Sequence, residues 1–106
     1  MGYTDKVVFR VYLDGDIIAL LPQIASTLDG YLCQSYMHVG QHGAANIDVV
    51  VRQTRLATAE EYRVLLAELE QIGYNLVVGK KCTNHDSQIR QEQAARWRRQ
   101  NEVVEG

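Results

Sequence analysis

The feature that most constrains the fold of this chain is an Asp14-Gly15 pair set between two apolar runs. Before the pair, residues 7–13 alternate in character, and their apolar side chains fall on one face: Val7, Phe9, Val11 and Leu13. After it, residues 16–21 are almost entirely apolar. An Asp-Gly pair in this setting is a strong short-range signal for a β-hairpin, because both residues tolerate positive φ.

The second strand is expected to end at Pro22, because proline has no N–H to donate to a sheet ladder. Residues 22–30 are then expected to form a loop. Residues 31–39 alternate again and predict a third strand with two faces. Its expected core face carries Tyr31, Cys33, Ser35, Met37 and Val39, and its other face carries a polar row directed outward or into a groove, namely Gln34, Tyr36 and His38.

The next segment, residues 44–53, has conflicting signals. Its β-branched run over 47–51 favours a strand, whereas Asn46 followed by Asp48 is typical of a helix start. We favour a short helix, because residues 43–46 resemble a helix entry.

The clearest helix covers residues 59–72. Thr58 and Glu61 form a capping box, and Gly73 is the expected C-terminal stop. Its apolar stripe consists of Tyr62, Leu65, Leu66, Leu69 and Ile72. Residues 74–78 then predict a last strand.

Residues 83–106 differ from the rest in being rich in Gln and Arg and poor in large apolar side chains. A helix with so narrow an apolar stripe must dock or fray. We therefore predict one α+β domain over residues 1–82 and a basic C-terminal helix or frayed tail over 83–106. The domain is expected to hold a small, mostly antiparallel sheet of three or four strands, covered on one face by one main helix.

Composition narrows the class of protein. With 46% hydrophobic and 23% charged residues, the 106-residue chain is globular in character rather than disordered. No apolar run approaches the roughly 20 residues of a membrane helix, and the first residues lack a signal-peptide pattern. We expect a cytoplasmic protein with no membrane contact.

A candidate binding site is predicted where the third strand ends, at Tyr36-Met37-His38-Val39-Gly40-Gln41-His42-Gly43. Polar groups on a glycine-containing loop at a strand end are a common way to build a site. The predicted binding residues are Gln34, Tyr36, His38, Gln41 and His42. The glycines are interpreted as turn residues.

The same residues allow an enzyme as an alternative, either metal-dependent or hydrolytic and centred on His38 and His42. The spacing matches no known zinc or nucleophile signature, however. We therefore predict no metal ligands, no cofactor and no catalytic residues, and favour a protein that is not an enzyme.

A second alternative is nucleic-acid association through the basic segment. Its candidate contacts are Lys80, Lys81, Arg96, Trp97, Arg98 and Arg99. Arginines beside a tryptophan suit phosphates and stacked bases. The isoelectric point of about 5.9 argues against this, because nucleic-acid domains are usually clearly basic.

Three segments in order are similar to a family of small uncharacterised bacterial proteins associated with phages, plasmids and other mobile elements. They are residues 9–16, the Tyr-x-His-Val-Gly-Gln-His-Gly stretch at 36–43, and residues 57–62. The resemblance spans roughly residues 6–80. It implies a cytoplasmic accessory protein that binds a host or element-encoded macromolecule, and it brings no established activity.

Taken together, the sequence favours a small accessory protein that acts by protein–protein binding. It does not name the partner, and it leaves open whether the effect is inhibition, activation or scaffolding. A free strand edge in so small a sheet would also support a homodimer.

Overall fold

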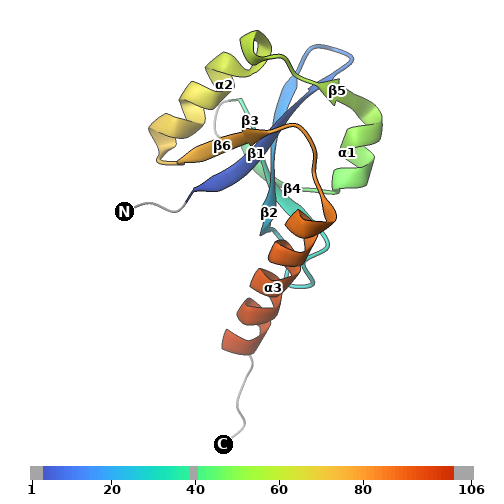
Figure 1. The fold of residues 1–106 in the computed structure, drawn as a ribbon, viewed down its shortest axis with the longest axis vertical. Coiled ribbons are helices and arrows are strands. Elements are labelled where there is room, and N and C mark those ends of the chain that lie inside the picture. Colours follow the sequence, from blue (N-terminus) through green and yellow to red (C-terminus); the bar gives the residue numbers. More distant parts are fainter. Residues whose placement is uncertain (1–3, 39–40, 102–106) are drawn as a thin grey trace, which may run out of the picture.

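A computed structural model describes residues 4–38 and 41–101. The elements follow in the order β1 (Asp5–Tyr12), β2 (Ile17–Ala25), β3 (Cys33–Met37), β4 (Gln41–Ala45), α1 (Ile47–Gln53), β5 (Thr54–Leu56), α2 (Ala59–Ile72), β6 (Leu76–Gly79) and α3 (Asn84–Gln100) (Figure 1). The α+β class is confirmed.

The six strands form one sheet in the order β4-β3-β2-β1-β5, and β6 also pairs with β1. All pairings are antiparallel except that of β6 with β1. The prediction of three or four strands is wrong: β4 lies where a turn and a helix entry were expected, and β5 lies between the two expected helices, where no strand was expected. Both are short strands at opposite sides of the sheet order, where pairing with a neighbour outweighs weak local propensity.

The Asp-Gly hairpin is confirmed. Gly15 has a φ of 95° and its N–H donates to the carbonyl of Tyr12 at 2.9 Å, while Tyr12 N–H donates to the carbonyl of Asp16 at 2.8 Å. Because β1 ends at Tyr12, Leu13 belongs to the turn and is fully exposed, contrary to its predicted place on the core face.

Pro22 does not end β2, which continues to Ala25. The register between β2 and β3 shifts between Leu21 and Ala25, so Pro22 lies in an irregular part of the strand where no ladder donor is required. Its carbonyl accepts a 2.7 Å hydrogen bond from Arg90 Nη1. The predicted loop therefore begins only after Ala25.

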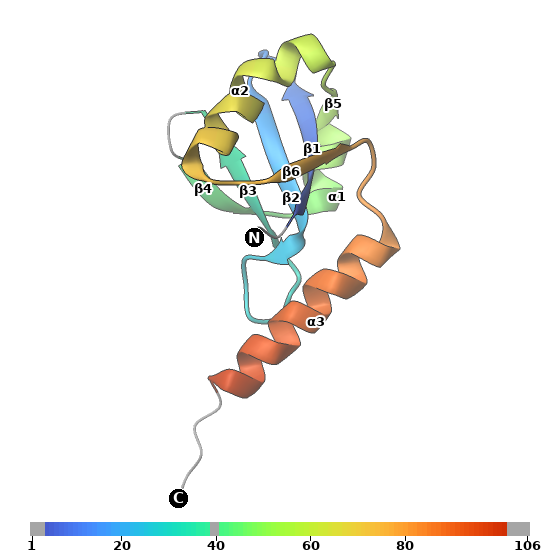
Figure 2. The same ribbon diagram turned by 60° about the vertical axis from the view of Figure 1, so that its left-hand side comes forward.

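Helices lie on both sides of the sheet, and the prediction of a single covered face is wrong (Figure 2). One core cluster joins alternate residues of β1, β2 and β3 to Leu65 and Leu69 of α2. A second cluster, on the opposite face, includes Leu20 and Cys33 and is covered by Val50 of α1. The strands of the middle of the sheet are therefore buried on both faces, which a short chain achieves by folding three helices around one sheet.

The helix starts follow their predicted local signals. In α2, Thr58 and Glu61 form the predicted capping box, and Gly73 follows the last turn with a φ of 125°. In α1, Asn46 is the N-cap and its side chain accepts from the N–H of Val49, so the preference for a short helix is confirmed.

The C-terminal segment forms a helix, α3, which packs along β2 and extends beyond the sheet (Figure 2). Its docking face is largely charged: of its three buried residues, Asp86, Arg90 and Ala94, two are ionisable. Arg90 is 6% exposed and donates to the carbonyls of Gly30 and Pro22 at 2.8 and 2.7 Å. Gln93 accepts a 2.6 Å hydrogen bond from the N–H of Ala25. A helix that is hydrophilic in composition is thereby held by the backbone of the second half of β2 and of the segment that follows it.

Candidate functional site

Five side chains from β3, β4, α2 and the segments that directly follow β3 and α2 meet at one edge of the sheet, and we call them the histidine–tyrosine rim: Tyr36, His38, His42, Glu68 and Tyr74. Three of them come from the stretch singled out in the sequence. The other two come from α2 and the turn that follows it.

Glu68 joins two of these side chains. Its Oε2 accepts a short hydrogen bond from the hydroxyl of Tyr36, and its Oε1 lies 2.7 Å from Nδ1 of His38. The side chain of His38 is 70% exposed, whereas that of Glu68 is 22% exposed. The carboxylate therefore forms the floor of the rim and the imidazole its outer surface.

His42 occupies the neighbouring position on β4. It pairs with Tyr36 in the β3–β4 register, and the two rings meet edge to face with centroids 4.7 Å apart. Its Nε2 lies 3.1 Å from the hydroxyl of Tyr74. Burial, together with the nearby charge of Asp5, raises the pKa of Tyr74, so this hydroxyl keeps its proton at neutral pH.

Tyr36 was predicted to be an exposed contact residue, and this is wrong. It is 1% exposed and belongs to the core cluster beneath α2. The alternation that placed it away from Cys33 is right, but both faces of β3 are covered, so both residues are buried. Tyr36 is therefore the buried member of the rim.

No hydrogen bond within the described residues joins either glutamine of the predicted site to a histidine. Gln34 is half-buried on the same face of β3 as Tyr36 and pairs with Ala44 of β4 and Leu21 of β2. Gln41 directly precedes His42 on β4, so the two side chains point to opposite faces. Val39 and Gly40 of the motif lie outside the described residues.

Glu68 and Tyr74 were not predicted as site residues. Each is about thirty positions away in sequence from its histidine partner, with separations of 30 and 32. One usable signal was present: Glu68 flanks the apolar stripe of α2 beside Leu69, so it lies at the border of the buried face.

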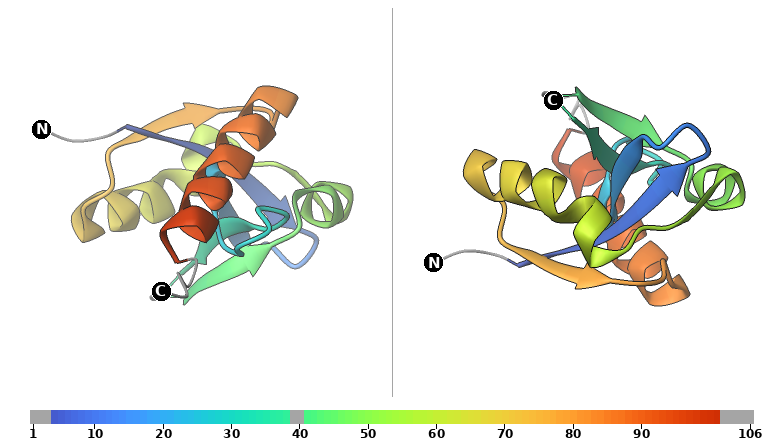
Figure 3. Two further views of the ribbon diagram at one scale, coloured as in Figure 1. Left: turned by 90° about the horizontal axis from the view of Figure 1, so that it is seen from below. Right: turned by 90° about the horizontal axis from the view of Figure 1, so that it is seen from above.

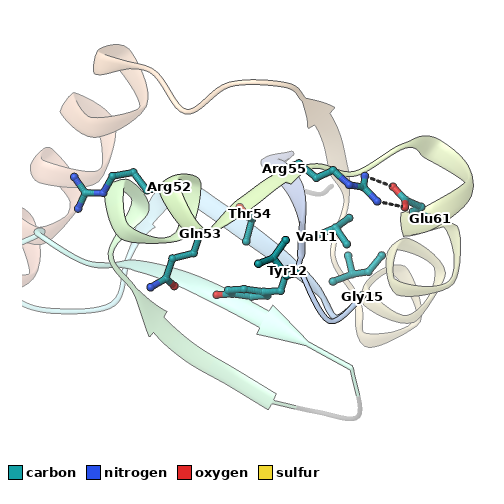
Figure 4. A pocket seen from close by; sticks show the side chains of 10 residues that line it. Val11, Tyr12, Gly15, Arg52, Gln53, Thr54, Arg55 and Glu61 are labelled. Atoms are coloured by element: carbon teal, nitrogen blue, oxygen red, sulfur yellow. Dashed lines mark hydrogen bonds and ion pairs between the residues drawn. The ribbon is translucent and has the colours of Figure 1, made fainter.

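A separate hollow of about 630 Å³ lies between the β1–β2 turn, α1, β5 and the start of α2 (Figure 4). Tyr12 and Gln53 line it, and Arg55 closes one side through hydrogen bonds of 2.9 and 2.6 Å to Glu61. None of the predicted site residues lines this hollow.

The basic residues of the nucleic-acid alternative fall into two groups. Lys80 and Lys81 precede α3, while the three arginines and Trp97 lie near its end, about 20 Å further along at 1.5 Å per residue. Arg98 donates to the carbonyl of Leu28, so it is engaged within the fold. The structure does not gather these residues into one surface.

Among residues 4–38 and 41–101, no group of three or more His, Cys, Asp or Glu side chains is arranged to hold a metal ion. In the same residues no helix is both long and apolar enough to cross a membrane.

No protein-family model, no curated protein and no solved structure matches this chain. What the rim does must therefore be argued from its own geometry.

Proposed function

We propose that this chain acts by protein–protein binding and that the histidine–tyrosine rim is its contact surface. The observation that carries the proposal is that two exposed imidazoles are held in place by groups of a single helix end. Glu68 fixes one ring nitrogen of His38, and Tyr74 lies at hydrogen-bond distance from one ring nitrogen of His42.

Among residues 4–38 and 41–101, nothing hydrogen-bonds to the second ring nitrogen of either histidine, which is Nε2 in His38 and Nδ1 in His42. Side chains that are already ordered lose little conformational entropy when a partner binds. Aromatic surfaces with polar atoms are also favoured at the centres of interfaces.

The enzyme alternative gains less support from the same geometry. Ser35, the nearest hydroxyl nucleophile in sequence, is 6% exposed and donates to the carbonyl of Gly43. It lies on the opposite face of β3 from Tyr36 and from the rim. Glu68 and Tyr74 orient the two imidazoles, and such orientation serves a binding surface as well as it serves a catalytic base.

The resemblance of residues 6–80 to proteins of mobile elements suggests which kind of partner the chain binds. In that setting the partner is a host or element-encoded macromolecule, and the chain is an accessory protein that modulates it.

The test is affinity purification of the tagged chain from cells that naturally carry it, comparing wild type with the double variant His38→Ala/His42→Ala. The matched control is His85→Ala, which removes the remaining histidine, exposed at the start of α3. We expect partners that wild type and His85→Ala retain and the double variant loses.

Equal recovery of every partner by all three proteins would contradict the proposal. Thermal unfolding of each variant, followed by circular dichroism, shows that any loss is not caused by unfolding.

A further inference from the structure

The outer side of β4 is a strand edge that lacks the features by which proteins usually prevent pairing with another strand. Within the part of the chain that the structure describes, β4 ends the strand order and pairs with β3 alone. Its sequence, QHGAA, contains no Lys, Arg, Asp, Glu or Pro, and its first four residues are exposed. Seen from below and from above, no helix of the described residues lies beyond it (Figure 3). Natural proteins usually block such edges with charges, proline or bulges, because free N–H and C=O groups recruit another strand.

The direction of the free backbone groups follows from one side-chain contact. Ser35 Oγ donates to the carbonyl of Gly43 at 3.0 Å, so this carbonyl faces β3. In an antiparallel ladder the N–H and C=O of one residue point to the same side, and successive residues alternate. His42 and Ala44 therefore direct their N–H and C=O groups to the free edge.

The strand is complementary to itself about Gly43. If a second β4 runs antiparallel with Gly43 opposite Gly43, all five residues overlap, and His42 of each copy pairs with Ala44 of the other. This register places a large side chain against a small one and satisfies the four outward groups of each strand. A register centred on His42 would overlap only residues 41–43 within the strands and bring two imidazoles face to face.

We propose that a second copy of this chain pairs with β4 across a twofold axis through Gly43, joining two six-stranded sheets into one continuous sheet. The interface is isologous, as in most homodimers, and closes on itself. Side chains opposite each other in a continuous sheet share a face, so the two histidine–tyrosine rims lie on the same side. The dimer thus displays two copies of the rim in one orientation, and its existence does not depend on what the rim binds.

The first experiment measures the molar mass of the 106-residue chain by light scattering over a range of concentrations. Wild type is expected to reach twice the 12.0 kDa of one chain. Ala44→Pro removes an outward N–H and leaves the ladder to β3 intact, so it should be monomeric. Val77→Lys is the control, because Val77 is 56% exposed on β6, which borders β1 at the other side of the sheet. It should remain dimeric.

The second experiment tests the register of the proposed pairing, and it can be carried out even if Ala44→Pro does not fold. In the proposed register the two Gly43 residues form a non-hydrogen-bonded pair, whose spacing of about 4.5 Å between Cα atoms suits a disulfide. A side chain is tolerated there, because an added Cβ would lie 3.7 Å from Ser35 Oγ. Gly43→Cys should form a covalent dimer on mild oxidation, and Val77→Cys should not.

The native cysteines give little background, because burial raises the pKa of Cys33 to about 12 and of Cys82 to about 11. A wild-type chain that stays monomeric at about 1 mM, where even a millimolar affinity populates the dimer, overturns the proposal. A dimer in which Gly43→Cys crosslinks no faster than Val77→Cys also overturns it.

Discussion

Lys6 Nζ lies 2.7 Å from Asp86 Oδ2, so an ion pair joins the first strand of the sheet to the last helix. Asp86 is 2% exposed, and its other oxygen accepts a 2.9 Å hydrogen bond from Gln23. The same carboxylate accepts from the N–H of Thr83 and so caps α3. One buried carboxylate therefore accepts hydrogen bonds from three separate segments: β1, β2 and the residue that precedes α3.

Replacing Asp86 by Ala should lower the free energy of unfolding by roughly 2–4 kcal/mol, because it leaves the partly buried Lys6 and the Gln23 amide without their acceptor. Urea denaturation measures the change. Glu92→Ala, on the exposed side of the same helix, is the control and should stay within about 0.5 kcal/mol of wild type. Equal effects of the two variants would mean that α3 is not docked through Asp86.

The same carboxylate predicts acid sensitivity. Burial favours the protonated form of Asp86, but the hydrogen bonds from Lys6, Gln23 and Thr83 outweigh it and hold the pKa below the ordinary value of 3.8. A lowered pKa in the folded state contributes stability above the ordinary value, and this stability is lost as the pH falls through the folded pKa.

Unfolding free energy should therefore fall below about pH 4, and the fall should be shallower in Asp86→Asn, which has no charge to lose. Urea titrations between neutral pH and pH 3 check both slopes. Burial raises the pKa of Asp5, which acts in the opposite direction, so the comparison of the two proteins, rather than the wild-type slope alone, is decisive. Parallel pH profiles would contradict the role of Asp86.

Tyr36 should behave as a core residue. Tyr36→Ala is expected to cost about 3–5 kcal/mol, because it empties a site that is 1% exposed between the sheet and α2. Tyr36→Phe keeps the ring packing and removes the hydroxyl that donates to Glu68, so we expect a cost of about 1 kcal/mol. Urea denaturation separates the two. If Tyr36→Ala cost less than about 1 kcal/mol, the result would contradict the burial of Tyr36 and favour its predicted place at the surface.

The two thiols should be inert in the folded chain. Burial, the largest effect on each, raises the pKa of Cys33 to about 12 and of Cys82 to about 11, and only the thiolate attacks a disulfide reagent. We expect slow reaction with a chromogenic disulfide at pH 8 and fast reaction of both thiols in denaturant. Rapid labelling of the native protein would show that the face covered by α1 opens readily.

The sequence correctly predicts those structural features whose contacts join residues only a few positions apart. The turn at Asp14-Gly15, the cap of α1 at Asn46 and the whole of α2 follow from residues at most four positions apart. Burial could not be predicted in the same way. Alternation correctly placed Tyr36 and Cys33 on opposite faces, but only the packing of helices on both sides of the sheet decides that both are interior.

The sequence alone determined the class of fold, the main helix and the stretch that carries two of the rim's side chains at the surface. The tertiary structure decided the rest, because it depends on segments far apart in the chain. Glu68 reaches His38 across 30 positions, and Lys6 reaches Asp86 across 80. Pro22 is tolerated within β2 because the ladder shifts there. Such contacts leave no local pattern, since each partner would be equally stable in water until the fold brings them together.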